Sequence, residues 1–272
     1  MRIRISHEMT HRFVPPARML IQNLRLTPSS FDSQYVQGWR ISHDIDASLR
    51  QTEDAHGNIL SSFSHHGAPL ERLSVTARGE VETTDAAGVV RGSVERLPPE
   101  MYLRESPLAH ANGALREFAA EAVAGAADPL DAAHRLTSAL HETLSFDAEA
   151  PEVSATAAEA FALRRGQAQD FAHAFIACAR FLGRPARYIS GYRAGDEDRP
   201  PGAHAWAEAH VPVLGWVAFD ATASICADER YVRVAVGFDA QDAALVRSAL
   251  GGVEDKVDAS ILVEQAGFQI QA

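Results

Sequence analysis

The sequence predicts an α+β protein in which an antiparallel β-sandwich precedes a domain of helices packed on an antiparallel sheet. Two changes in hydrophobic period support this architecture. Over about residues 1–85, apolar and polar residues alternate in short runs, which is typical of half-buried strands. From about residue 111 the apolar residues recur at helical spacing, and alternation returns after residue 185. We therefore expect domains at 1–85 and 111–272, joined by an extended connection at 86–110.

Strands account for the first domain in this interpretation. Arg2–Ile5 alternates, the odd positions of Tyr35–Ile45 are mostly apolar, and Leu73–Val81 repeats the pattern. Turn signals such as Pro15-Pro16 and His56-Gly57-Asn58 separate the runs. Short alternating strands with turns between them predict the sandwich.

Four helices followed by three strands are predicted in the second domain. An alanine-rich helix is expected at 115–127, and Asp128-Pro129 begins the next helix with proline at its first position. Thr156–Glu159 matches a capping box, and a further amphipathic helix runs from about 168 to 182. Strands are expected at 186–192, 204–211 and 216–220.

Composition and charge limit the functions of the chain. Its formal charge is −11 and its 25 Lys and Arg are scattered, so no nucleic-acid partner is expected, because phosphate backbones bind clustered cations. No apolar run approaches the roughly 18 residues that span a bilayer, and the first residues alternate instead of forming a signal core. We therefore expect a cytoplasmic protein with no membrane partner. With only Cys178 and Cys226 present, neither a disulfide framework nor a thiolate zinc site is expected.

Candidate chemistry lies on two consecutive strands. His204 and Trp206 share a face of the first, Asp220 ends the second, and the turn-like Pro212–Gly215 lies between them. In a hairpin whose paired numbers sum to 424 or 426, His204 and Asp220 lie on one side. The carboxylate can then hold one imidazole nitrogen and fix the tautomer, which is the orienting half of a catalytic triad. A register with an odd sum would separate the two, and the sequence pattern leaves this alternative open.

A helix N-terminus, the usual place for a catalytic cysteine, precedes these strands at RRGQAQDFAH (164–173). Unpaired amides and the helix dipole favour a thiolate there, yet Ala168 occupies the position. Cys178 lies about 15 Å further along the helix, at roughly 1.5 Å per residue, so we expect a core thiol. Cys226 is also expected to be structural. Asp170 and His173 could hydrogen-bond each other, and we expect them to hold the helix start.

Four motifs, in order, resemble those of the bacterial transglutaminase-like proteins: Gly166–His173, Arg187–Tyr192, His204–Glu208 and Gly215–Asp220. The first motif in that family reads Gly-x-Cys-x-Asp-Phe/Tyr-Ala-His. The N-terminal third also resembles the β-sandwich that precedes this core in the family, so the resemblance covers nearly the whole chain. It implies a transglutaminase-like core with papain-like cysteine protease or acyltransferase chemistry, in which a thiolate attacks a peptide or carboxamide carbonyl.

The resemblance also implies a role for each site residue. Ala168 takes the nucleophile position, where cysteine is expected, His204 is the general base and acid, and Asp220 orients it. Gln169 is a candidate second oxyanion donor beside the backbone N–H of residue 168, and Trp206 is a candidate cleft residue. The implied partner is a peptide or protein substrate, and no cofactor is implied. Alanine at 168 removes the acyl acceptor, and Asp220 is followed by alanine where many relatives have proline.

No metal site is expected either. His204 and Glu208 lie about 13 Å apart on an extended strand, at roughly 3.3 Å per residue, which is too far to chelate one ion. His141-Glu142 lacks a second histidine at helical spacing.

Three functional hypotheses remain open. Ala168 is an engineered substitution in a working thiol enzyme, or it is natural in a pseudoenzyme that binds peptide or amide ligands, or the protein is a scaffold that binds through its sandwich. The intact His204 and Asp220 favour the first hypothesis modestly, although a binding cleft could also retain them.

Overall fold

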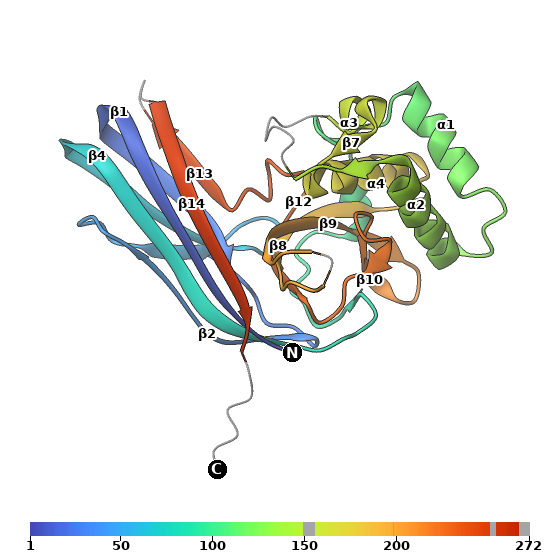
Figure 1. Ribbon diagram of the computed structural model, residues 1–272, viewed down its shortest axis with the longest axis horizontal. Coiled ribbons are helices and arrows are strands. Elements are labelled where there is room, and N and C mark those ends of the chain that lie inside the picture. Colours follow the sequence, from blue (N-terminus) through green and yellow to red (C-terminus); the bar gives the residue numbers. More distant parts are fainter. Residues whose placement is uncertain (149–155, 198, 251–253, 267–272) are drawn as a thin grey trace, which may run out of the picture.

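The computed structural model describes residues 1–148, 156–197, 199–250 and 254–266. Figure 1 shows two parts side by side: a sheet of long strands, and a smaller sheet covered by helices. In the described part of the chain, no helix is both long enough and apolar enough to cross a membrane.

The first sheet contains the longest strands of the molecule, β1 and β4, which run antiparallel along most of their length. Two strands pair with β4 on one side, and two C-terminal strands pair with β1 on the other. The bounds are β1 (Arg2–Thr27), β2 (Gln34–His43), β3 (Arg50–Glu53), β4 (Ile59–Thr83), β13 (Val246–Leu250) and β14 (Glu254–Gln265).

The predicted two-sheet sandwich is not confirmed, because these six strands form one hydrogen-bonded sheet. At one end of the sheet, Ile3, Ile5 and Val81 pack in an apolar cluster with Tyr192, Val232 and Val234, which lie outside these six strands. The pairing of β1 with β4 shifts register between Arg12 and Ala17, and Phe13 and Leu20, on either side of that shift, share one apolar cluster with Phe63. Apolar alternation is the same in a bent sheet and in a sandwich, so the sequence pattern could not separate them.

The second sheet has the strand order β11-β10-β9-β8-β12, with the short β5 beside β10. Its bounds are β5 (Val89–Val90), β8 (Ala186–Arg193), β9 (Gly202–Val211), β10 (Gly215–Asp220), β11 (Ile225–Cys226) and β12 (Tyr231–Gly237). The three strands predicted from alternation are therefore present as β8, β9 and β10. In the β9–β10 hairpin Trp216 pairs with His210, so the paired numbers sum to 426.

The four predicted helices cover one face of this sheet: α1 (Gly113–Ala122), α2 (Pro129–Thr143), α3 (Ala157–Leu163) and α4 (Ala168–Phe181). Asp128 caps α2 through the N–H groups of Leu130 and Asp131, and Thr156 with Glu159 forms the predicted capping box of α3. Two short strands pair in parallel: β6 (Ser145–Phe146), which follows α2, and β7 (Arg165–Gly166), which precedes α4.

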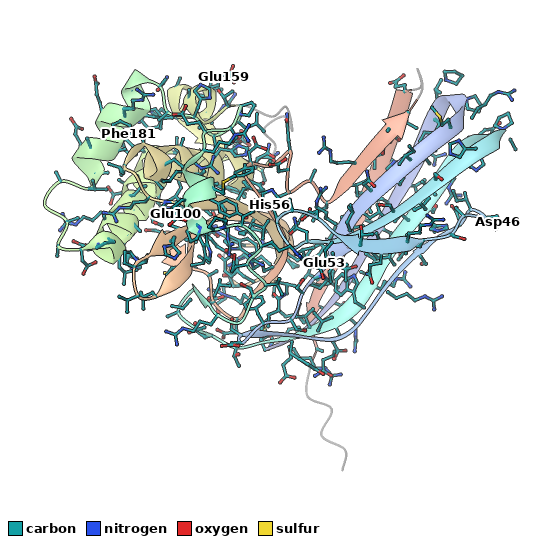
Figure 2. The ribbon with its side chains drawn as sticks, turned by 180° about the vertical axis from the view of Figure 1, so that it is seen from behind. Asp46, Glu53, His56, Glu100, Glu159 and Phe181 are labelled. Carbon is teal, nitrogen blue, oxygen red and sulfur yellow. The ribbon has the colours of Figure 1, made fainter. Side chains whose placement is uncertain are left out.

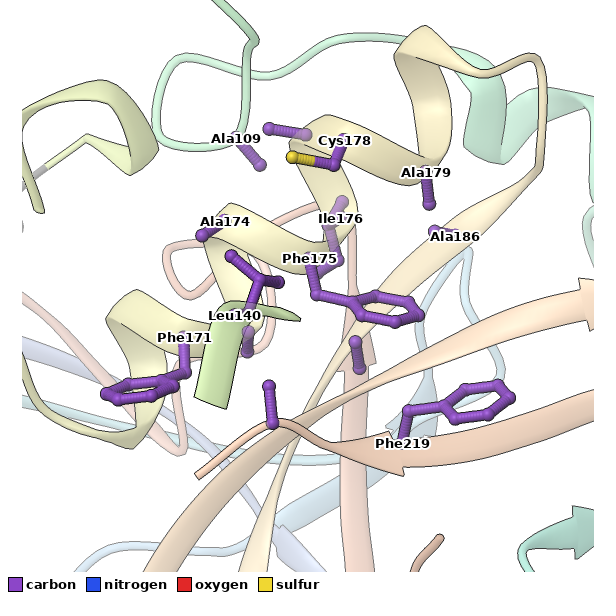
Figure 3. Close-up of a cluster of buried hydrophobic side chains, with 14 of the residues drawn as sticks. Ala109, Leu140, Phe171, Ala174, Phe175, Ile176, Cys178, Ala179, Ala186 and Phe219 are labelled. Carbon is purple, nitrogen blue, oxygen red and sulfur yellow. The ribbon is translucent and has the colours of Figure 1, made fainter. Parts of the chain in front are cut away.

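Helix α4 is buried between the sheet and the other helices. Figure 3 shows Phe175 of α4 above Phe219 of β10, with Cys178 on the other side of the helix. The two phenyl rings are stacked with centroids 5.4 Å apart. Since α4 is apolar on nearly all sides, its position against the sheet is strongly determined.

Two observations refine the domain division. β13 and β14 lie within 111–272 in sequence, yet they complete the N-terminal sheet. The 86–110 segment contains the short strand β5 and the 3-10 helix η1 (Pro99–Leu103), which buries Tyr102.

Polar contacts join the two sheets. The Asn58 side chain bonds both the N–H and the C=O of Val236 in β12, and His7 Nδ1 shares a 2.9 Å hydrogen bond with the Tyr192 hydroxyl. His56, which Figure 2 shows between the two parts, bonds the Tyr102 hydroxyl. The N-terminal sheet is therefore attached directly to β8 and β12 of the second sheet.

Candidate functional site

His204 and Asp220 are joined at the start of β9 and the end of β10. His204 Nε2 lies 2.7 Å from Asp220 Oδ2. The register of 426 places the two residues diagonally on one face of the hairpin, within side-chain reach. Of the two even registers that would bring them together, the structure has this one.

Asp220 is buried and ionised. Its side chain is 1% exposed, and hydrogen bonds from His204, Thr222 and Tyr231 outweigh the cost of burial and lower its pKa from 3.8 to about 2. Oδ1 accepts the N–H and the hydroxyl of Thr222, and Oδ2 accepts the Tyr231 hydroxyl at 2.7 Å. A carboxylate can only accept, so Nε2 of His204 must carry the proton in their hydrogen bond.

The His204 ring is held on its faces as well. It is stacked near Trp206, with centroids 6.3 Å apart, and meets Tyr231 edge-on at 5.7 Å. Its side chain is 10% exposed, and Nδ1 makes no hydrogen bond within the described residues. With Nε2 protonated, a neutral ring offers Nδ1 as the proton acceptor.

The N-terminus of α4 is built around Gly166 and Asp170. Asp170 Oδ2 accepts the N–H of Gln167 at 2.8 Å, which fixes the turn into the helix. A Cβ on Gly166 would lie 2.5 Å from that oxygen, so glycine is required at this position. Burial raises the pKa of Asp170, although the N–H of Gln167 lowers it. Ala168 follows as the first helical residue, and its N–H therefore has no acceptor within the helix.

Asp170 and His173 do not hydrogen-bond each other. His173 is fully buried and its Nε2 accepts the N–H of Ala240 at 3.1 Å, which ties α4 to the segment after β12. Burial lowers its pKa to about 4, so the ring is neutral near pH 7. Both side chains support the helix start, as expected from the sequence.

Helix α4 and the His204 strand meet through small residues. Ala205, Ala207 and Ala209 of β9 pack in the apolar cluster that surrounds α4, and Ala168 packs against the same cluster. His204 precedes Ala205 directly, so the histidine lies near the start of the strand that packs against α4. Alanine on the helix-facing side of β9 permits this close packing of helix and sheet.

A buried ion network holds β9 on the face of the sheet that is opposite α4. Glu208 has no exposed side-chain surface, and it accepts hydrogen bonds from Arg187 at 2.7 Å and Arg233 at 2.8 Å. Together the two guanidinium groups outweigh burial and lower the pKa of Glu208. Arg187 also pairs with Glu95, and its guanidinium lies 3.9 Å from the centre of the Trp216 ring. These contacts join β8, β9 and β12 on the same face of the sheet as the His204–Asp220 pair.

The remaining predicted residues have different surroundings. Gln169 is half-buried in the first turn of α4. Trp206 is 2% exposed in a cluster with Ile189, Trp216 and Tyr231 on the far face of the sheet, so it supports the His204 ring from the interior.

Neither cysteine resembles an activated thiol. Burial raises the pKa of Cys178 to about 12, and burial with the nearby Asp85 charge raises that of Cys226 to about 11. The prediction of a packed core thiol at Cys178 is confirmed. Within the described ranges, no three His, Cys, Asp or Glu side chains are grouped to hold a metal ion.

Sequence reasoning missed Thr222 and Tyr231. Thr222 follows Asp220 by two residues, a spacing at which an aspartate often accepts a backbone N–H. Tyr231 lies on a strand separated from β10 by two other strands in the sheet order, so only the tertiary structure brings it to Asp220.

The helix N-terminus and the His–Asp hairpin define a transglutaminase-like core as the class of protein. Residues 116–221 match the family described as "Transglutaminase-like superfamily", and residues 3–82 match the "Bacterial transglutaminase-like N-terminal region". The chain belongs to the bacterial transglutaminase-like proteins.

Relatives and solved structures extend this similarity over the whole chain. An uncharacterized protein of Mycobacterium tuberculosis is 27% identical over 92% of this chain and 87% of its own length. One of Mycobacterium leprae is 26% identical over 97% of this chain and 98% of its own length. The crystal structure of a "Putative Cysteine Protease" from Cytophaga hutchinsonii is similar in fold, with a TM-score of 0.76, 20% identity, and coverage of 99% of this chain and 92% of that one.

Proposed function

We propose that the chain carries the acyl-transfer site of a cysteine protease or transglutaminase, with Ala168 at the nucleophile position. As written, it would bind a peptide or carboxamide ligand without forming a thioester. The observation that carries this proposal is the buried His204–Asp220 pair, carried by two strands of the sheet on which α4 packs. Such a pair orients an imidazole for proton transfer.

The geometry supports a defined sequence of steps for a cysteine at position 168. His204 Nδ1 takes the thiol proton, and the thiolate adds to the substrate carbonyl carbon. The backbone N–H of residue 168 donates to the oxyanion, and Gln169 is the candidate second donor. The C–N bond then breaks, and the amine leaves with the proton that His204 returns. Water or a second amine, deprotonated by His204, adds to the thioester carbonyl and expels the thiolate.

Asp220 would act through His204 in every step. Its hydrogen bond at Nε2 keeps Nδ1 as the reactive nitrogen and stabilises the imidazolium that forms. Alanine at 168 removes only the sulfur from this arrangement. This also favours a second candidate, a natural pseudoenzyme whose cleft binds peptide or amide ligands.

Restoring the sulfur tests the proposal. The Ala168→Cys variant should form a thioester with members of a peptide and carboxamide library, seen by mass spectrometry as an adduct that hydroxylamine removes. The matched control is Ala168→Cys with His204→Ala, which should lose the adduct. If the restored thiol forms no hydroxylamine-sensitive adduct with any member, the acyl-transfer proposal is wrong.

The pseudoenzyme candidate requires a different measurement. Peptide-library binding to the native chain should weaken in His204→Ala if ligands occupy the cleft. Binding that is indifferent to this change would place the ligand elsewhere and favour a scaffold.

A further inference from the structure

Tyr231 contacts the oxygen of Asp220 on which His204 depends. It is the first residue of β12 and is 5% exposed. Its hydroxyl donates to Asp220 Oδ2 at 2.7 Å, the same distance as that between Oδ2 and His204 Nε2. A buried neutral tyrosine that bonds a carboxylate at this distance makes a charge-assisted hydrogen bond, about twice as strong as a neutral one.

The number of donors around Asp220 shows what this bond does. A carboxylate has about four lone-pair sites. Two donors from Thr222 occupy Oδ1, and Tyr231 occupies one side of Oδ2. One site is left, and His204 Nε2 occupies it. The direction in which Asp220 can accept from the histidine is therefore fixed by its other three donors.

We propose that Tyr231 is a positioning residue of the His204–Asp220 pair, whose hydroxyl holds Oδ2 in the direction that keeps Nε2 of His204 bonded and Nδ1 as its proton-accepting nitrogen. This inference rests on the proposed function for its chemical meaning. Its physical content, an effect of the Tyr231 hydroxyl on the His204–Asp220 hydrogen bond, can be measured in the native chain.

The hydroxyl and the ring of Tyr231 make separate contacts with the site. The ring meets His204 edge-on at 5.7 Å and Trp206 at 5.3 Å, and phenylalanine would keep both contacts. Only the hydroxyl reaches Asp220. Tyr231→Phe therefore removes one hydrogen bond and leaves the aromatic packing in place.

The surroundings of Tyr231 keep its hydroxyl protonated, so that it can donate a hydrogen bond. Burial and the Asp220 charge raise its pKa above the ordinary value, although Arg193, whose guanidinium lies 5.7 Å from the ring centre, lowers it. Arg193 is itself paired with Asp196, and Arg199 is bonded to Thr222 on the other side of the carboxylate. The tyrosine hydroxyl therefore remains protonated near pH 7 and donates to Asp220.

The first experiment follows the Nε2 proton of His204 in the native chain by ¹H NMR, as a downfield signal that disappears in His204→Ala. In Tyr231→Phe we expect this proton to exchange with water about tenfold faster, the factor that corresponds to the loss of one hydrogen bond to a charged group at about 1.4 kcal/mol. The matched control is Tyr192→Phe, which removes a buried hydroxyl bonded to His7. An unchanged signal in Tyr231→Phe would overturn the proposal whatever the fate of the acyl-transfer proposal.

The second experiment measures the pH profile of iodoacetamide alkylation in the Ala168→Cys background. We expect Tyr231→Phe to lower the ratio of the rate at pH 6 to that at pH 9 about tenfold, because the thiolate formed at pH 6 requires an aligned imidazolium. Tyr192→Phe should keep the ratio. A merely structural effect would scale both rates equally. A ratio that stays constant or rises would contradict a positioning role.

Discussion

Replacing Asp220 by asparagine should remove a pH-dependent part of the folding stability. The pKa of Asp220 falls from 3.8 to about 2 on folding, because three neighbouring residues donate to the buried carboxylate. A difference of this size, at about 1.4 kcal/mol per pH unit, stabilises the folded chain by about 2 kcal/mol at pH 7. Asp220→Asn should therefore be less stable than the native chain by at least about 2 kcal/mol.

The sign of the pH dependence follows from the lowered pKa. Above pH 3.8 both the folded and the unfolded chain carry the charge, and the stabilisation is complete. As the pH falls toward 2, the unfolded chain takes up the proton first, and the stabilisation is lost. About half of this stabilisation should be lost by pH 3. The difference in unfolding free energy between the native chain and Asp220→Asn should therefore narrow by about 1 kcal/mol between pH 7 and pH 3.

Urea unfolding at pH 7, 5 and 3 measures this gap. Asp85→Asn is a matched control, because the Asp85 side chain is exposed and accepts the N–H of Ala87 two residues along the chain. Its stability gap should stay within about 0.5 kcal/mol of zero at each pH. If the difference in unfolding free energy between the native chain and Asp220→Asn is small at pH 7, or constant down to pH 3, the conclusion that Asp220 is buried and ionised is refuted.

Three further predictions concern other buried groups. Glu208→Ala should destabilise the fold by about 3 to 5 kcal/mol, measured by urea unfolding, because Arg187 and Arg233 lose the buried carboxylate that they share. Burial lowers the pKa of His7 from 6.5 to about 4. Between these pH values the unfolded chain binds a proton at His7 and the folded chain does not, so the free energy of unfolding should fall by about 3 kcal/mol as the pH drops from 6.5 to 4. This fall should be largely absent in His7→Leu; an equal fall in that variant would contradict the assignment. In the native chain, Cys178 should react with iodoacetamide only after unfolding, since its thiol is buried with a pKa of about 12; rapid labelling of folded protein would contradict this.

Local sequence signals predicted the helices and the hairpin well. Asp128-Pro129 and the Thr156–Glu159 capping box depend on contacts within a few residues, and both occur as expected. The His204–Asp220 pair also follows from local facts, namely strand alternation and a short turn. These features could be read from the sequence because the interactions that form them are close along the chain.

Long-range pairing could not be predicted in the same way. The alternation in β1 indicates one buried face, but it does not say which other part of the chain covers that face. Nor does it identify β14, more than 200 residues away, as the neighbour of β1. Tyr231 was missed for the same reason, because its contact with Asp220 depends on how β12 folds back across the sheet.

One measurement tests the central claim most directly: the iodoacetamide reactivity of a cysteine restored at position 168. At pH 6 to 7, the thiol of Ala168→Cys should react at least about ten times faster than Cys178, because the α4 N-terminus and the His204 imidazolium both favour the thiolate. Adding His204→Ala should remove most of that advantage. If the restored cysteine is no more reactive than Cys178, or keeps its reactivity without His204, the claim of an assembled site that lacks only its sulfur is wrong.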